Sequence, residues 1–237
     1  MSERPTFDPE ESKDKQKSEK EIIWEEKLKK VDKIKDSLEN EVDELVKETV
    51  AAFHVNGLST SGSCEGHIDW GCSAPWIQVG AVEKPDERFV GQDEIEIEVA
   101  EKYGLRYEDL RYGISEESPD YKKRKKAWYE AHERMVKNGE TEAYKEWVAK
   151  NNELREKAGR LLEEFYQGRE VSDDVKLVIE ERAEETFRVR NGGENYLINT
   201  KKRTKEQIAE ITDNLPKCQQ EMKEFTEFLK RKYFESM

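Results

Sequence analysis

Apolar side chains recur at steps of three and four residues in the first part of the chain, between residues 22 and 53. The members of this pattern are Trp24, Leu28, Val31, Ile34, Leu38, Val42 and Leu45. Such spacing places side chains on one narrow stripe of an α-helix, and it predicts a single helix over 22–53. The repeat is close to 3.5 residues, as in a coiled-coil seam. The stripe therefore packs either on the chain's own later helices or on a partner helix, including one from a second copy in a homo-oligomer.

A second stripe predicts a long helix at the end of the chain. Thr204 and Gln207 have the spacing of a capping box, which marks a helix start. The stripe that follows consists of Ile208, Ile211, Leu215, Cys218, Met222, Phe225 and Leu229. Pro216 lacks a backbone N–H donor, so we expect it to kink or split this helix.

Two further helices are predicted in the middle of the chain. Ser118 and Pro119 form a helix start, and Gly139 follows the corresponding end. The next apolar stripe ends near Gly168, and the two helices are predicted to form a hairpin. Residues 93–103 fit a short helix and also alternate as a strand would, so both assignments stay open.

Strand patterns are short and few. Residues 75–82 are rich in β-branched side chains and bounded by Pro and Gly, and residues 175–179 and 187–189 alternate between apolar and charged side chains. A turn at 191–193 followed by residues 196–198 predicts one more strand. The order of elements predicts an α+β fold with a small antiparallel or mixed sheet covered by long helices.

Composition adds the domain organisation to this outline. Charged residues make up 41% of the 237 residues and hydrophobic residues only 34%, which favours one core with long solvated helical extensions. Residues 1–17 are polar and contain Pro5 and Pro9, so we expect a disordered tail, with a single α+β domain over 18–237.

Charge and hydropathy exclude some classes of partner. The net charge of −13 opposes general binding to nucleic acids, and the basic run 122–126 before Trp128 and Tyr129 is interpreted as a solvated helix face. The sequence has no apolar run long enough to cross a membrane. Three cysteines in 237 residues do not make a disulfide framework, which is typical of secreted proteins. We therefore expect a cytoplasmic protein.

Chemistry is concentrated in the segment 59–77, which is rich in Gly and Ser. Cys64, His67 and Cys72 lie there within nine residues, and thiolate and imidazole are zinc ligands. His54 is a candidate fourth ligand. The first hypothesis is therefore a zinc-binding loop.

A second hypothesis makes the same loop catalytic. Cys64 would act as a nucleophile, His67 as the base that activates it, and Glu65 or Asp69 would hold the imidazole tautomer. Backbone N–H groups around Ser61, Gly62, Ser63 and Gly66 would bind an anion or an oxyanion. A third interpretation is structural: a small buried thiol and glycines that only permit the turn.

Two arginines suggest the class of ligand. Arg188 and Arg190 share one strand face, and beside the loop they would form a cationic wall. We expect a small polar or anionic molecule bound near Cys64 and His67. An interaction protein that uses its apolar helix stripes is the alternative function.

The segment 61–67, SGSCEGH, followed by Pro75 and Trp76, resembles a loop found in uncharacterised bacterial proteins with an SCEGH motif. Its Ser63-Cys64-x-Gly66 core is also similar to the SCSGR loop of the wybutosine-synthesis tRNA methyltransferases, with His67 in place of the arginine. Because of this difference, tRNA and S-adenosylmethionine are not implied for this chain.

Overall fold

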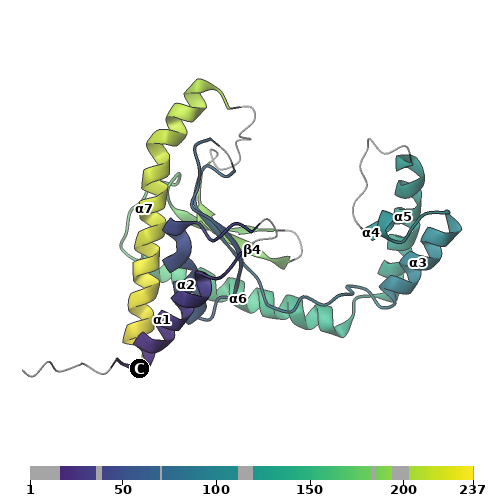
Figure 1. The fold of residues 1–237 in the computed structure, drawn as a ribbon, viewed down its shortest axis with the longest axis horizontal. Coiled ribbons are helices and arrows are strands. Elements are labelled where there is room, and N and C mark those ends of the chain that lie inside the picture. Colours follow the sequence, from purple (N-terminus) through teal and green to yellow (C-terminus); the bar gives the residue numbers. More distant parts are fainter. Residues whose placement is uncertain are drawn as a thin grey trace, which may run out of the picture.

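The computed structural model describes residues 17–35, 39–69, 71–111, 120–182, 185–193 and 203–236. It has the predicted α+β fold, with a small antiparallel sheet packed on long helices (Figure 1). A second group of helices lies at the far end of the long helix α6 (Glu142–Tyr166). Several predictions lie outside the described residues. These are the tail apart from Lys17, the helix start at Ser118 and Pro119, and the strand 196–198.

The sheet has four strands in the order β1-β2-β4-β3, and every neighbouring pair is antiparallel. Their bounds are Thr60–Cys64, Trp76–Val79, Leu177–Glu181 and Phe187–Asn191 for β1, β2, β3 and β4. One face buries apolar side chains that include Ile77, Phe187 and Val189. Because side chains alternate along a strand, Trp76, Gln78, Arg188 and Arg190 occupy the opposite face.

The predicted single helix over 22–53 is wrong. The structure has α1 (Glu19–Val31), a 3-10 turn η1 (Glu44–Val46) and α2 (Lys47–Val55), with a chain reversal between α1 and η1. In one straight helix, Trp24 and Phe53 would lie about 44 Å apart at 1.5 Å per residue. Folding back places both in one core, together with Leu28, Val31 and Val42 of the stripe. Ile34 and Leu45, two further members of the stripe, are exposed.

The main core lies between the sheet and four helices, because α1 also contributes Trp24 and Val31 to it. α2 packs on α7 (Lys205–Glu235), and α6 (Glu142–Tyr166) packs on β3 and α7. The predicted capping box at Thr204 and Gln207 is confirmed, as is the apolar stripe of α7 from Ile211 onwards. α7 continues through Pro216, so the predicted split does not occur.

A second, smaller core holds α3 (Gln92–Lys102), α4 (Glu108–Arg111) and α5 (Tyr121–Asn138). Residues 93–102 are therefore helical and not a strand. The predicted hairpin of α5 with α6 is wrong. α5 packs on α3 and α4, and it runs in a different direction from α6 and not back along it (Figure 1). The salt bridges Lys102–Glu130 and Arg134–Glu98 join α3 to α5.

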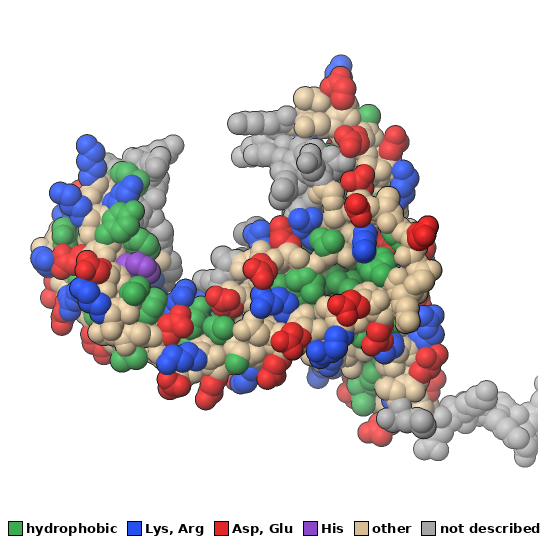
Figure 2. Space-filling view, turned by 180° about the vertical axis from the view of Figure 1, so that it is seen from behind, with side chains coloured by type: hydrophobic (Ala, Val, Ile, Leu, Met, Phe, Trp, Pro, Cys, Tyr) green, Lys and Arg blue, Asp and Glu red, His purple; other side chains and the backbone are tan. Residues whose placement is uncertain are grey.

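The surface is hollowed between the part that holds the main core and the part that holds the smaller core (Figure 2). α6 connects these two parts.

α5 contains seven Lys and Arg residues against two Glu, so this helix is basic in an acidic chain. Lys122, Lys125 and Lys126 are exposed, as expected of a solvated helix face. Within the described residues, no helix is both long and apolar enough to span a membrane.

One buried acid in the smaller core yields a prediction about stability. Glu96 is 6% exposed, and its Oε1 accepts a hydrogen bond from Gln92 Nε2 at 3.2 Å. Its Oε2 has no hydrogen-bond partner among the described residues. Burial raises the pKa of Glu96 above its ordinary value of 4.5. The charged form is therefore less favourable in the folded protein than in the unfolded chain.

We expect Glu96→Gln to stabilise the protein at pH 7 by on the order of 1 kcal/mol, because it removes a poorly solvated charge. Because the folded-state pKa of Glu96 is raised, its ionisation opposes folding at pH above that value. The advantage of the variant should shrink as the pH falls towards 4.5 and the wild-type carboxyl group takes up its proton. Denaturant unfolding at both pH values measures this difference. Glu101→Gln, at an exposed position of α3, is the control, and an equal effect from both would contradict the explanation.

Candidate functional site

The segment predicted to be a loop begins with a strand. Residues 60–64, TSGSC, form β1, and Cys64 lies opposite Trp76 at the end of the β1–β2 pair. Ser and Gly are poor strand formers, so this strand depends on pairing with β2 and not on its own propensity. The consequence is that Cys64 is held at the end of a sheet strand, where the loop 65–75 starts.

The loop turns back on itself within a few residues. Gly66 and Gly71 have φ values of 83° and 61°, in the region that favours glycine. The His67 N–H donates to the Cys72 carbonyl oxygen at 2.7 Å and closes the turn. The backbone of Gly66 lies against Ala74 and Leu215, so the loop is packed onto α7.

Asp43 is brought to this loop from the segment before α2. Its Oδ2 accepts a hydrogen bond from the Glu65 N–H at 3.0 Å, and Glu65 Oε2 accepts one from the Leu45 N–H at 3.1 Å. These two bonds tie the start of η1 to the residue after Cys64. The carboxylate of Asp43 is thereby fixed beside the thiol and the imidazole.

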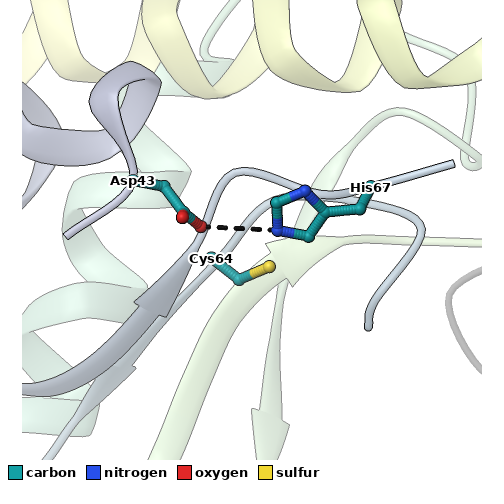
Figure 3. A group of neighbouring side chains, drawn as sticks. All are labelled: Asp43, Cys64 and His67. Atoms are coloured by element: carbon teal, nitrogen blue, oxygen red, sulfur yellow. Dashed lines mark ion pairs between the residues drawn. The ribbon is translucent and has the colours of Figure 1, made fainter. Parts of the chain in front are cut away.

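Asp43, Cys64 and His67 form one compact group (Figure 3). A carboxylate oxygen, the thiol sulfur and an imidazole nitrogen all lie within 4.8 Å of one another. The distance from His67 Nε2 to Asp43 Oδ2 is 3.6 Å. Cys64 is buried, whereas the side chains of His67 and Asp43 are 14% and 28% exposed. Solvent therefore reaches the group from the side of Asp43.

The orientation of the imidazole differs from that in a catalytic triad. In a triad, the nucleophile meets one ring nitrogen and the carboxylate meets the other. Here the carboxylate of Asp43 and the sulfur of Cys64 both lie at the ring edge that carries Nε2, and Nδ1 points away from them (Figure 3). Three potential ligand atoms that lie this close together form a group that could hold a metal ion.

The environment of Cys64 keeps its thiol protonated at neutral pH. Burial raises the pKa of Cys64 to about 11, and the negative charge of Asp43 adds to this effect. The Gly66 N–H, which lies 3.4 Å from the sulfur, acts in the opposite direction. A thiol with this pKa is a weak nucleophile at pH 7. The same N–H contact is favourable to a sulfur that carries negative charge.

Two of the residues predicted as metal ligands lie outside this group. Cys72 is not in the group; it packs against Ala74 and Cys218. His54 is not in the group either, because its Nε2 hydrogen bonds with Thr60 Oγ1 at 2.8 Å. Thr60 and Cys64 are the two ends of β1, about 13 Å apart at 3.3 Å per residue.

Asp43 was not found from the sequence. It lies 22 residues before Glu65, and no spacing motif connects it with the loop. Its only signal in the sequence is its place ahead of an apolar helical pattern, which is typical of a helix cap. Glu65 was predicted to orient the imidazole, but its carboxylate accepts a hydrogen bond from the Leu45 N–H. The carboxylate that faces the imidazole ring is that of Asp43.

The other predicted residues lie around this group. Gly62 lies under the ring of Trp76, and the Gly66 N–H faces Cys64 Sγ and not an open anion site. Asp69 is near enough to Arg203 to affect its pKa. The role of Ser61 and Ser63, both in β1, stays a prediction.

Arg188 and Arg190 are on β4, two strands away from Cys64. The guanidinium of Arg188 lies 3.8 Å from the centre of the Trp76 ring, and Arg190 Nε lies 3.3 Å from Glu180 Oε2. A cationic wall for a ligand at Cys64 therefore stays a prediction.

Comparison with known proteins assigns no family and no function to this group of residues. A scan against protein-family models gave no match, and neither the curated proteins nor the solved structures that were searched match this chain.

Proposed function

We propose that the protein binds one divalent transition-metal ion, with zinc as the best match, through Asp43, Cys64 and His67. The observation that carries this proposal is the convergence of three different ligand atoms within 4.8 Å. These atoms come from three separate places in the chain: the segment before α2, the end of β1 and the following loop.

The distances support a tetrahedral ion. Zinc binds nitrogen and oxygen at about 2.0–2.2 Å and sulfur at about 2.3 Å, so neighbouring ligand atoms are separated by roughly 3.4–3.7 Å. The separation of 3.6 Å between His67 Nε2 and Asp43 Oδ2 lies in this range. It is too long for a hydrogen bond. Because the three ligand atoms lie within 4.8 Å of one another, a shift of at most about 1.2 Å would bring the sulfur to the same separation of 3.6 Å.

The donor set selects the type of ion. A thiolate and an imidazole favour zinc and its neighbours in the transition series, whereas magnesium and calcium prefer oxygen ligands. Two backbone contacts support the ligands, because the Gly66 N–H faces the sulfur and the Glu65 N–H binds the carboxylate. Such supporting bonds orient the ligands of metal centres.

Three protein ligands leave a fourth position on the ion. In zinc proteins, a water molecule or a substrate atom occupies such a position. Asp43 is partly exposed, whereas Nε2 of His67 is buried, so a small polar or anionic molecule would reach the ion from the side of Asp43. The small-molecule ligand expected from the sequence would then bind at the metal.

The alternative function, an interaction protein with exposed helix stripes, has less support. An interaction protein of this kind requires apolar helix stripes that a partner can reach. Trp24 and Val31 of the first stripe, and Met222 and Phe225 of the last one, are buried in the chain's own core.

Titration of the metal-free protein with cobalt(II) tests the proposal, because cobalt replaces zinc and absorbs visible light. We expect one equivalent to bind, with intense visible bands of a tetrahedral ion and a near-ultraviolet band from the cobalt–sulfur bond. Cys64→Ser should lose the sulfur band, whereas Cys218→Ser, at another buried cysteine, should keep it. Weak octahedral bands without a sulfur band in the wild type would contradict the proposal.

A further inference from the structure

One arginine outside the group of ligands holds the loop that carries His67. Arg203 immediately precedes Thr204, the N-cap residue of α7. Its Nη1 donates to the carbonyl oxygens of His67 and Ile68 at 3.3 and 2.5 Å, and its Nη2 donates to that of Gly71 at 3.4 Å. Three carbonyl groups of one short turn therefore converge on a single guanidinium.

A second contact joins the same loop to α7. Gln219 Nε2 donates to the Glu65 carbonyl oxygen at 3.0 Å, and Leu215 lies against the backbone of Gly66. Gln219 of α7 thus binds the start of the loop, next to Cys64, and Arg203, just before α7, binds its middle at His67, Ile68 and Gly71. The His67–Cys72 backbone bond closes the turn that Arg203 binds.

We propose that Arg203 is a positioning residue of the metal site, an inference that rests on the proposed function. By binding the carbonyl groups on either side of the turn, Arg203 fixes the backbone at His67. That backbone sets the position of the imidazole, and in this conformation Nε2 lies 3.6 Å from Asp43 Oδ2.

The shape of the guanidinium group explains the use of arginine here. Its N–H donors form a rigid planar fork, which can bind several carbonyl groups in fixed directions. Lysine would keep the positive charge, but its three N–H donors are on a single nitrogen at the end of a flexible stem. The charge alone is therefore insufficient, and the arrangement of donors is what holds the turn.

Zinc affinity of the full-length protein tests this inference, measured by competition with a coloured chelator for the wild type, Arg203→Lys and Arg203→Ala. Loss of a group that orients a ligand typically weakens metal binding by about 10–100-fold. We expect a loss of about this size for both variants, and a changed cobalt(II) spectrum for Arg203→Lys. Arg231→Lys, near the other end of α7, should bind as the wild type does.

The outcomes separate this inference from the proposed function. If the wild type binds no metal, the proposed function fails. If the wild type binds one ion and Arg203→Lys binds it equally well with the same spectrum, only the role of Arg203 is overturned. A lower melting temperature of metal-free Arg203→Lys, with unchanged affinity and spectrum, would also overturn it, since that result describes a residue with a structural role alone.

Discussion

Replacing Asp43 by Asn is expected to weaken zinc binding by more than about 100-fold, because removal of a direct ligand exceeds the 10–100-fold loss typical of a supporting residue. An amide keeps the size of the side chain but provides no negative charge to the ion. His67→Ala and Cys64→Ser should have effects of at least this size. Zinc competition with a chelator measures all three variants on one scale.

Cys72→Ser and His54→Ala are the matched controls, because spacing in the sequence favoured these residues and the structure places them outside the group. Both should bind zinc within about threefold of the wild type, the loss expected for residues that neither ligate the ion nor orient a ligand. If Cys72→Ser abolished binding and Asp43→Asn did not, the ligand set given by the fold would be incorrect.

Gly66→Ala is expected to lower the free energy of unfolding by about 2–5 kcal/mol and to weaken zinc binding as well. The φ value of 83° would cost an alanine about 1–2 kcal/mol. Its Cβ would also lie 2.7 Å from Leu215 Cδ1 and 2.9 Å from the backbone carbon of Ala74, which adds an overpacking cost of about 1–3 kcal/mol. Relief of this overlap moves the N–H that faces Cys64 and the adjoining His67.

Gly168→Ala separates the two causes. Gly168 has a φ value of 74°, and a Cβ built there would meet nothing within 4 Å. This variant should therefore show only the backbone cost, about 1–2 kcal/mol, with unchanged zinc affinity. Denaturant unfolding of both variants gives the difference, and equal losses would mean that the contact of Gly66 with α7 is unimportant.

Elements with a strong local signal were predicted well from the sequence. The capping box at Thr204 and the stripe of α7 are local, since neighbours three or four residues apart determine them. The same holds for α6, whose N-cap is Thr141, and for the alternation in β4. These elements contain enough information within ten or fifteen residues to define their type.

Elements that depend on tertiary contacts were predicted poorly. The stripe from Trp24 onwards has the period of one helix, but α1 and α2 gain more buried apolar surface by folding back on each other. The sequence of β1 has little strand propensity, and only its pairing with β2 makes it a strand. The hairpin of α5 and α6 failed for the same reason, because α3 and α4 compete for the apolar face of α5.

The candidate site was half predictable. Cys64 and His67 are three residues apart in a glycine-containing segment, and local spacing was sufficient to select them. The third member of the group, Asp43, comes from a segment that only the fold brings near, through its bond with the Glu65 N–H. Spacing instead pointed to Cys72 and His54, which are close in sequence but face other neighbours.

X-ray absorption at the zinc edge of the protein loaded with one equivalent of zinc is the most direct measurement of the proposed site. The predicted ion has one sulfur ligand at about 2.3 Å and two protein nitrogen or oxygen ligands at about 2.0–2.2 Å, with a further light atom at the open position. Two sulfur ligands, or none, would contradict a centre made by Asp43, Cys64 and His67.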